Sequence, residues 1–109
     1  MTTLMNLTPH DVVIVRDGAP NIVLPRGHKV PRVLASHRPV GDVHGIPCMR
    51  AEYGEAVDLP PYDREADMLY IVSAMVRAAA PGRTDLASPG DLVRDATGVV
   101  LGCRWLVVS

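Results

Sequence analysis

Residues 12–24, VVIVRDGAPNIVL, place two apolar runs on either side of a tight turn. The run from Val12 to Val15 is rich in β-branched residues, which favour a buried strand. Asp17-Gly18 is a strong tight-turn signal, and the chain returns through Asn21–Leu24 as a partner strand. This segment therefore predicts a β-hairpin.

The rest of the chain continues this β-rich pattern, with one helix. The helix is expected over 74–80, beginning at Ser73 and stopped by Pro81-Gly82. Surface loops are predicted over 36–45 and 83–89. Further strands are predicted over 30–35 (at an edge or bulge because of Pro31), 46–53 and 55–57 (bent at Gly54), 69–72, 92–93 and, after a turn at 95–98, 99–108. The expected fold class is α+β: a mostly antiparallel β-sheet with one short helix, in a small single domain over residues 1–109.

The composition is that of a globular chain with a light core. Hydrophobic residues make up 48% and charged residues 21% of the 109 positions, whereas aromatic residues are 4% and Phe is absent. Tyr70 and Trp105 lie in apolar runs and are expected in the core. At this length such a core leaves a thin stability margin, and pairing with a second copy would help. A homo-oligomer is therefore expected.

The cysteine count and the apolar runs bear on class and location. Cys48 and Cys103 are too few for a disulfide scaffold or zinc cluster and are interpreted as small buried hydrophobes. No apolar run reaches the roughly 18–20 residues of a membrane span, and no basic stretch followed by an apolar segment opens the chain. A cytoplasmic location, without membrane association, is the expectation.

The positive charge is almost entirely arginine. Ten of the eleven basic residues are Arg, although the net charge is −1, which argues against a general nucleic-acid surface. A guanidinium is a flat fork of donors suited to phosphate and to ring stacking. A coding bias toward Arg codons explains the same count without any function.

Known catalytic and metal motifs are missing. The four histidines, His10, His28, His37 and His44, lack helical ligand spacing, and no nucleophile elbow, phosphate loop or dinucleotide fingerprint occurs. No metal, cofactor or catalytic residue is therefore predicted. In the turn at 8–11, Thr8 and Asp11 can satisfy backbone groups while the ring of His10 packs over it.

The loop Arg83-Thr84-Asp85 offers two interpretations. Its hydrogen bonds could hold the Arg83 guanidinium in a fixed direction for a phosphate, or Arg83 and Asp85 could form an ion pair that closes the loop. Arg94 and Arg104 could fall on facing strands of the last hairpin, as a second anionic contact or as a solvent-facing row. Tyr53 is the best candidate for stacking on a base.

The chain also resembles a known family along nearly its full length. This is a family of short proteins encoded by tailed phages and by actinobacterial and firmicute genomes that carry prophages. The resemblance rests on Asn6-Leu7-Thr8-Pro9-His10, Tyr53-Gly54-Glu55 before Leu59-Pro60, Tyr70-Ile71-Val72-Ser73, Arg83-Thr84-Asp85-Leu86, and the run from Pro89 to Asp95 leading to Gly102-Cys103. Membership fixes no activity by itself.

An analogy with other small phage proteins supplies a functional expectation. Some of these proteins are sponges, oligomers that bind and hide cyclic nucleotides or cyclic ADP-ribose signals of bacterial immune systems such as Thoeris and CBASS. The chain is similar to that class in its arginine content and differs in having few aromatic residues. The analogy implies a non-catalytic binder in the host cytoplasm, with a phosphate-bearing nucleotide as partner. The expected ligand-binding residues are Asn6, His10, Arg32, Tyr53, Arg83, Asp85 and Arg94.

Two other function classes remain open. One is a small phosphodiesterase or hydrolase that acts on a nucleotide through His10 and Glu55. The other is a protein-binding module that inhibits a host enzyme through an exposed strand edge.

Overall fold

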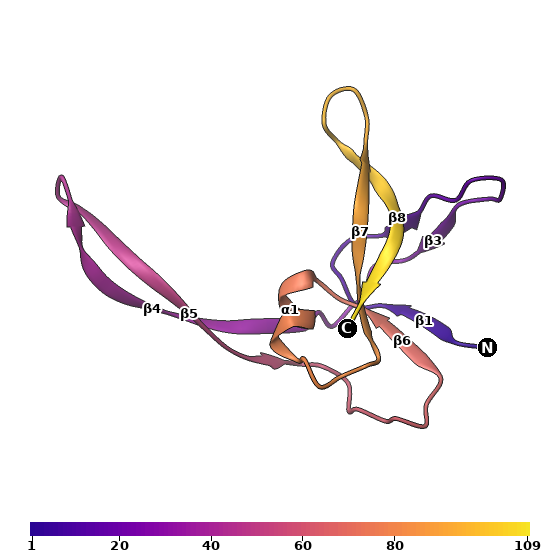
Figure 1. Cartoon of the computed structure of the whole chain (residues 1–109), viewed down its shortest axis with the longest axis horizontal. Helices are drawn as coiled ribbons and strands as arrows, with labels where there is room; N and C mark the ends of the chain where they lie inside the picture. The colour runs from indigo at the N-terminus through magenta and orange to yellow at the C-terminus, as the bar shows by residue number, and fades with distance from the viewer.

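The computed structural model describes all residues from 1 to 109 and confirms a strand-rich α+β fold with one short helix (Figure 1). The elements are β1 (Thr3–Asn6), β2 (Val12–Ile14), β3 (Ile22–Leu24), β4 (Arg32–Val43), β5 (Ile46–Val57), β6 (Met68–Ile71), α1 (Ala74–Ala79), β7 (Leu86–Arg94) and β8 (Val100–Val108). At six residues, α1 is far shorter than a helix that crosses a membrane.

The body of the molecule is a six-stranded sheet with the order β1-β6-β7-β8-β2-β3. The ladders β2–β3 and β7–β8 are antiparallel, whereas β1–β6, β6–β7 and β2–β8 are parallel. The sheet curls, so that β1 and β3 at its two ends contact each other, and the Gly27 amide donates to the Thr8 carbonyl across this junction at 2.8 Å. The predicted hairpin at 12–24 is thus confirmed as one end of a curled sheet.

The core is small and lies in two adjoining clusters. Val12, Ile14, Ile71 and Cys103 form the first cluster, inside the sheet. Val72, Val76 and Leu86 form the second cluster, under α1. The Ser73 hydroxyl caps this helix by accepting from the Val76 amide at 3.2 Å, as its position in the sequence predicted. Only 13 of the 109 residues are buried, so the light core is confirmed.

A second sheet consists of β4 and β5 alone and projects from the body as a hairpin, here called the arm (Figure 1). The arm turns at His44-Gly45, where both residues have positive φ, 53° and 77°, as a type I′ turn requires. Its length raises the radius of gyration to 17.0 Å, against about 13 Å for a compact domain of this size. One copy therefore does not bury its arm.

Several sequence-based predictions are wrong in this region. The predicted loop at 36–45 is the strand and turn of the arm, because Ser36–Val43 pair with Ile46–Glu52. The two predicted strands at 46–53 and 55–57 form the single strand β5, although Gly54 does mark a bulge opposite Leu34. The predicted loop at 83–89 ends early, because β7 begins at Leu86 with a parallel pairing to Tyr70.

Predictions of burial also need correction. Trp105 was expected in the core, yet it is 57% exposed, and Tyr70 is half-buried. Cys48 is half-buried on the arm, whereas Cys103 is buried as predicted. The physical reason is the same in each exposed case: the β7–β8 hairpin and the arm both extend beyond the body, so their apolar runs have no second layer to pack against.

Candidate functional site

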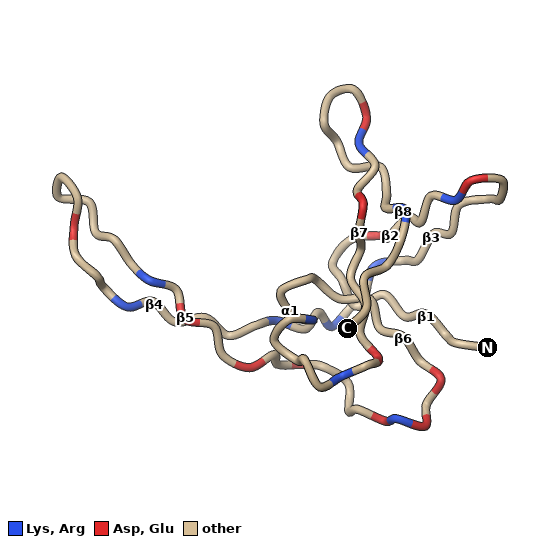
Figure 2. Tube along the Cα trace, in the orientation of Figure 1, with Lys and Arg blue, Asp and Glu red and all other residues tan.

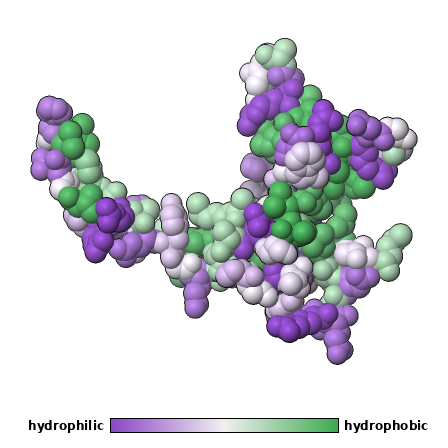
Figure 3. Space-filling view, viewed as in Figure 1, coloured by the Kyte–Doolittle hydropathy of each residue, from purple (hydrophilic) through white to green (hydrophobic).

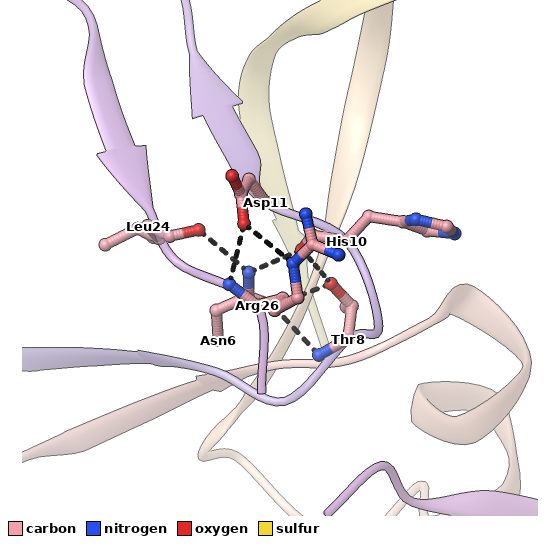
Figure 4. Close-up of polar contacts among 6 residues, drawn as sticks. All are labelled: Asn6, Thr8, His10, Asp11, Leu24 and Arg26. Carbon is pink, nitrogen blue, oxygen red and sulfur yellow. Dashed lines mark hydrogen bonds and ion pairs between the residues drawn. The ribbon is translucent and has the colours of Figure 1, made fainter. Parts of the chain in front are cut away.

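The Asn6 turn is a closed hydrogen-bond cluster at the end of β1 (Figure 4). The side chain of Asn6 is buried, and its amide donates to the carbonyls of His10 at 2.8 Å and Leu24 at 3.0 Å. Its Oδ1 accepts from the Thr8 amide at 2.8 Å and the Thr8 hydroxyl at 2.7 Å. All the hydrogen-bonding capacity of Asn6 is therefore used to join β1, the turn and the end of β3.

The side chains of His10 and Asp11 lie beside this cluster and make no hydrogen bond to Asn6. The ring of His10 is exposed and points away from the cluster rather than packing over the turn (Figure 4). Asp11 Oδ1 accepts from the backbone amide of Arg26 at 3.0 Å, which ties β2 to the segment after β3. The structure thus brings Asn6 and His10 together, as expected, but only His10 is free to face a ligand.

Two grooves open beside the Asn6 turn. The first has a volume of about 190 Å³ and is mainly apolar, with Thr8, His10 and Asp11 on its polar side. Its other lining residues are Val12, Val13, Pro89, Leu92, Val100, Leu101, Gly102 and Cys103. The second groove, about 340 Å³, lies between β1 and the segment after β3, where Arg26 contributes positive charge and His28 is a further lining residue. Neither groove contains Arg32, Tyr53, Arg83 or Arg94.

Arg83 forms an ion pair with Asp85 that closes the loop between α1 and β7. Its Nε and Nη2 donate to the two carboxylate oxygens of Asp85 at 2.9 and 2.7 Å, and Nη1 donates to the Pro60 carbonyl. The two side chains are only 14% and 8% exposed, and the guanidinium carbon lies 5.1 Å from the ring centre of Tyr62. The hydrogen bonds that Arg83 donates to the Asp85 carboxylate raise the pKa of Arg83. The guanidinium is therefore committed to its own loop and presents no free fork.

Arg94 lies at the far end of the β7–β8 hairpin. Its Nη1 donates to the Gly98 carbonyl at 2.9 Å, which braces the turn at 95–98. Arg94 and Arg104 do fall on the facing strands β7 and β8. They are not opposite each other, because the strand partner of Arg94 is Val100 and Arg104 forms an ion pair with Asp91 at 3.4 Å. Figure 2 shows this hairpin and the arm pointing in different directions. Arg83, Arg94 and Arg32 hence do not converge within one copy.

The arm carries a different arginine cluster, which lies on one of its two faces. Arg38 is directly opposite Arg50 in the strand register, so both side chains point to the same face. Arg32 lies on that face as well, because it precedes Arg38 by an even number of residues on β4. We call Arg32, Arg38 and Arg50 the arginine face. Figure 2 marks in blue the positions along the arm at which basic residues lie. Arg32 and Arg50 have no hydrogen-bond or ion-pair partner, and Arg38 Nε lies 3.4 Å from Glu52 Oε1.

The opposite side of the arm is its apolar face. The register pairs Ala35 with Tyr53, His37 with Ala51 and Pro39 with Met49 on this face. Tyr53 therefore points away from Arg38 and Arg50, and it cannot stack on a ligand held between those two guanidinium groups. Glu55 lies in the bulge of β5, and nothing brings it into contact with His10.

Sequence reasoning missed Arg38 and Arg50 because their opposition depends on a bulge. Val40 has no partner between the pairs Pro39–Met49 and Gly41–Cys48. Without this extra residue, Arg38 would lie opposite Ala51 and the two arginines would be on different faces. The signal that was available is His44-Gly45, a two-residue hairpin turn between β-branched residues.

Metal-binding side chains do not cluster: no group of three or more His, Cys, Asp or Glu residues is placed to hold an ion. A scan with protein-family models and searches of curated proteins and of solved structures found no match to the chain. The site is therefore argued from its own geometry.

Proposed function

We propose that the chain binds and sequesters a phosphate-bearing nucleotide signal, a cyclic nucleotide or cyclic ADP-ribose, without cleaving it. In this proposal it is a phage or prophage accessory protein that acts against a bacterial immune signal in the host cytoplasm. The observation that carries the proposal is the direct opposition of Arg38 and Arg50 on the arginine face.

This opposition favours an anion on electrostatic grounds. Like charges directly across a strand pair destabilise it, and these two side chains extend from neighbouring strands toward the same solvent. A phosphate between them would replace that repulsion with charge-assisted, forked hydrogen bonds. Arg50 offers its whole guanidinium, since nothing in the chain pairs with it, whereas Glu52 neutralises part of the charge of Arg38.

Arg32 would contact a separate anionic group. It is six residues before Arg38, which corresponds to roughly 20 Å along an extended strand. One phosphate cannot bridge that distance, so Arg32 would contact a second phosphate of an extended ligand or a second ligand molecule. The net charge of the whole chain is −1, which makes the arginine face a local feature rather than part of a general positive surface.

Calorimetry tests the proposal directly. The purified chain is titrated with a panel of cyclic dinucleotides, cyclic trinucleotides and cyclic ADP-ribose isomers, and the bound ligand is recovered by heating and identified by mass spectrometry. We expect at least one member to bind and to be recovered intact. Failure of every member to bind would overturn the proposal, and a chemically altered ligand would favour the hydrolase reading instead.

A pair of variants locates the binding site. Arg50→Gln removes the unpaired guanidinium and should weaken binding by about 10-fold to 100-fold, the loss of hydrogen bonds to a charged group. Arg94→Gln removes an arginine that braces a distant turn, so ligand affinity should stay within about 2-fold of wild type. Equal losses in the two variants would show that the arginine face is not the site. Co-purification with a host protein, with no response to nucleotides, would favour the inhibitor reading.

A further inference from the structure

The apolar face of the arm begins on the core of its own chain and continues past it. At the base of the arm, Val33 and Ala56 pack against the cluster of Val72, Val76 and Leu86. Farther along the same face come the pairs Ala35–Tyr53, His37–Ala51 and Pro39–Met49, of which His37 is the one polar member apart from the Tyr53 hydroxyl. Tyr53 and Met49 are both more than half exposed. The surface that packs on the core is therefore left uncovered over most of the arm.

An uncovered two-stranded arm is physically incomplete. An isolated hairpin is marginally stable in water, and a hydrophobic face needs a further layer to hold it. At its base the arm contacts α1 and the core cluster under that helix. Figure 3 shows hydrophobic surface at the end of the arm and across the body around β7 and β8. Contiguous apolar patches that stay exposed in one copy of a protein often mark an interaction site.

The body presents a matching projection on β7 and β8. Trp105 is directly opposite Gly90, and its indole lies over that residue so closely that an added Cβ would be 2.6 Å from Nε1. The Val107 side chain is beside it, and Leu92 and Leu101 are exposed farther along. We call Trp105, Val107, Leu92 and Leu101 the Trp105 patch. Exposed Trp at the centre of an apolar patch is the residue type that most often anchors an interface.

The two surfaces also complement each other in shape. On β5 the small residue Ala51 lies between Tyr53 and Met49 on the same face, about 7 Å from each along the strand. Ala51 is therefore a low point between two large side chains on β5, with His37 opposite it on β4, and we call this position the Ala51 hollow. We propose that the Trp105 indole of one copy enters the Ala51 hollow of a second copy, so that the arm of one copy covers the Trp105 patch of the other.

The area that such a contact buries fits a reciprocal exchange. The free part of the arm, residues 35–43 with their partners, is roughly 30 Å long and about 10 Å wide. One arm on one patch would cover about 300 Å² on each side, which is small for a specific interface. When each copy gives its arm and receives the other, the total rises to about 1,200 Å², the lower limit of standard interfaces. This inference does not depend on nucleotide binding, because it uses the opposite face of the arm.

The test uses two charged variants and a matched control. Ala51→Glu removes the hollow, and Trp105→Glu removes the projection. Val23→Glu on β3 changes charge by the same amount at a residue that is 58% exposed, against 57% for Trp105. Sedimentation velocity without nucleotide should show self-association weakened at least roughly 30-fold in the first two variants and unchanged in the control. Wild-type association in either Ala51→Glu or Trp105→Glu overturns the proposal.

Mixing the two defective variants tests the pairing itself. A copy with Trp105→Glu retains an intact arm, and a copy with Ala51→Glu retains an intact patch. An equimolar mixture can therefore form mixed pairs with one good contact, which should associate more weakly than the wild-type pair but more strongly than either variant alone. An arm-on-arm or patch-on-patch interface gives no such recovery, and a mixture that associates no more than the two separate variants overturns the proposal. If far-UV circular dichroism shows that a charged variant is unfolded, Ala51→Leu and Trp105→Ala replace the pair. Ala51→Leu is apolar yet fills the hollow, so it must weaken association as well.

Discussion

Removal of the Asn6 side chain should be among the most damaging single changes in this chain. Asn6→Ala removes the side-chain donor to the Leu24 carbonyl and leaves the Thr8 amide without a partner, while the His10 carbonyl keeps its bond from the Thr8 hydroxyl at 2.9 Å. Each of the two losses costs about 1–1.5 kcal/mol, so the free energy of unfolding should fall by about 2–3 kcal/mol. For a urea m-value of about 2 kcal/mol per M, this loss lowers the midpoint by roughly 1 M.

Urea unfolding, followed by circular dichroism at one fixed protein concentration, measures this effect, since association changes apparent stability. Thr8→Val is the matched control, because it loses the hydroxyl but keeps the bond from its amide to Asn6, and it should cost only about 1 kcal/mol. A loss below about 0.5 kcal/mol in Asn6→Ala, or a larger loss in Thr8→Val, would refute the argument that Asn6 holds the turn together.

The isosteric change Asn6→Asp adds a pH dependence. A carboxylate at this position faces the carbonyls of His10 and Leu24, so it repels where the amide donated. The pKa of the new carboxyl is then expected to lie above the unfolded value of about 3.9, and the protonated form regains one donor. Stability of the variant should therefore rise as pH falls from neutral toward 4, and a variant whose stability falls over that interval would contradict the assignment.

Three further predictions concern the rest of the fold. Asp85→Asn breaks the largely buried ion pair with Arg83 and should lower the free energy of unfolding in urea by about 3 kcal/mol. The double variant Arg83→Met/Asp85→Leu should lower it by less, because no unpaired charge remains. A double variant that is less stable than Asp85→Asn would count against this explanation. Gly102→Ala places a Cβ 2.6 Å from the Val13 carbonyl and should lower the melting temperature clearly, because the backbone must move. Gly90→Ala meets the side chains of Trp105 and Val107 at 2.6 to 2.9 Å, and it should lower the melting temperature by less, because the indole can turn away. The reverse order would be inconsistent with the β8 packing. Hydrogen bonds from Thr97, Val99 and Gly98 lower the pKa of Asp95. Wild type should therefore be more stable than Asp95→Ala above about pH 4, and this difference in stability should vanish as pH falls through the folded pKa of Asp95. An equal difference at pH 7 and pH 2 would refute the prediction.

Local signals were enough to predict the elements that are formed by neighbouring residues. Asp17-Gly18 and the turn at 95–98 each gave a hairpin, and Ser73 and Pro81 gave the helix with nearly its observed ends. These elements depend on turn and cap residues that lie within a few positions of one another, so the local sequence shows them directly.

The arm could not be predicted in the same way. Ser36–Gly45 contains charged and turn-forming residues and little periodicity, because one face of β4 is arginine-bearing and the other lacks a core to pack against. The opposition of Arg38 and Arg50 depends on the unpaired residue Val40, and one residue of register moves every side chain to the other face. Likewise, the sequence showed that Arg83 and Asp85 could pair, but only the approach of Pro60 and Tyr62 shows that the guanidinium is enclosed.

We have proposed that the arm of one copy covers the Trp105 patch of a second copy. Sedimentation equilibrium of the unmodified protein, over a wide concentration range and without nucleotide, measures this most directly. We expect a mass that is a multiple of 11.7 kDa and that decreases only on dilution. A mass of 11.7 kDa at every concentration, with native circular dichroism, would contradict the claim.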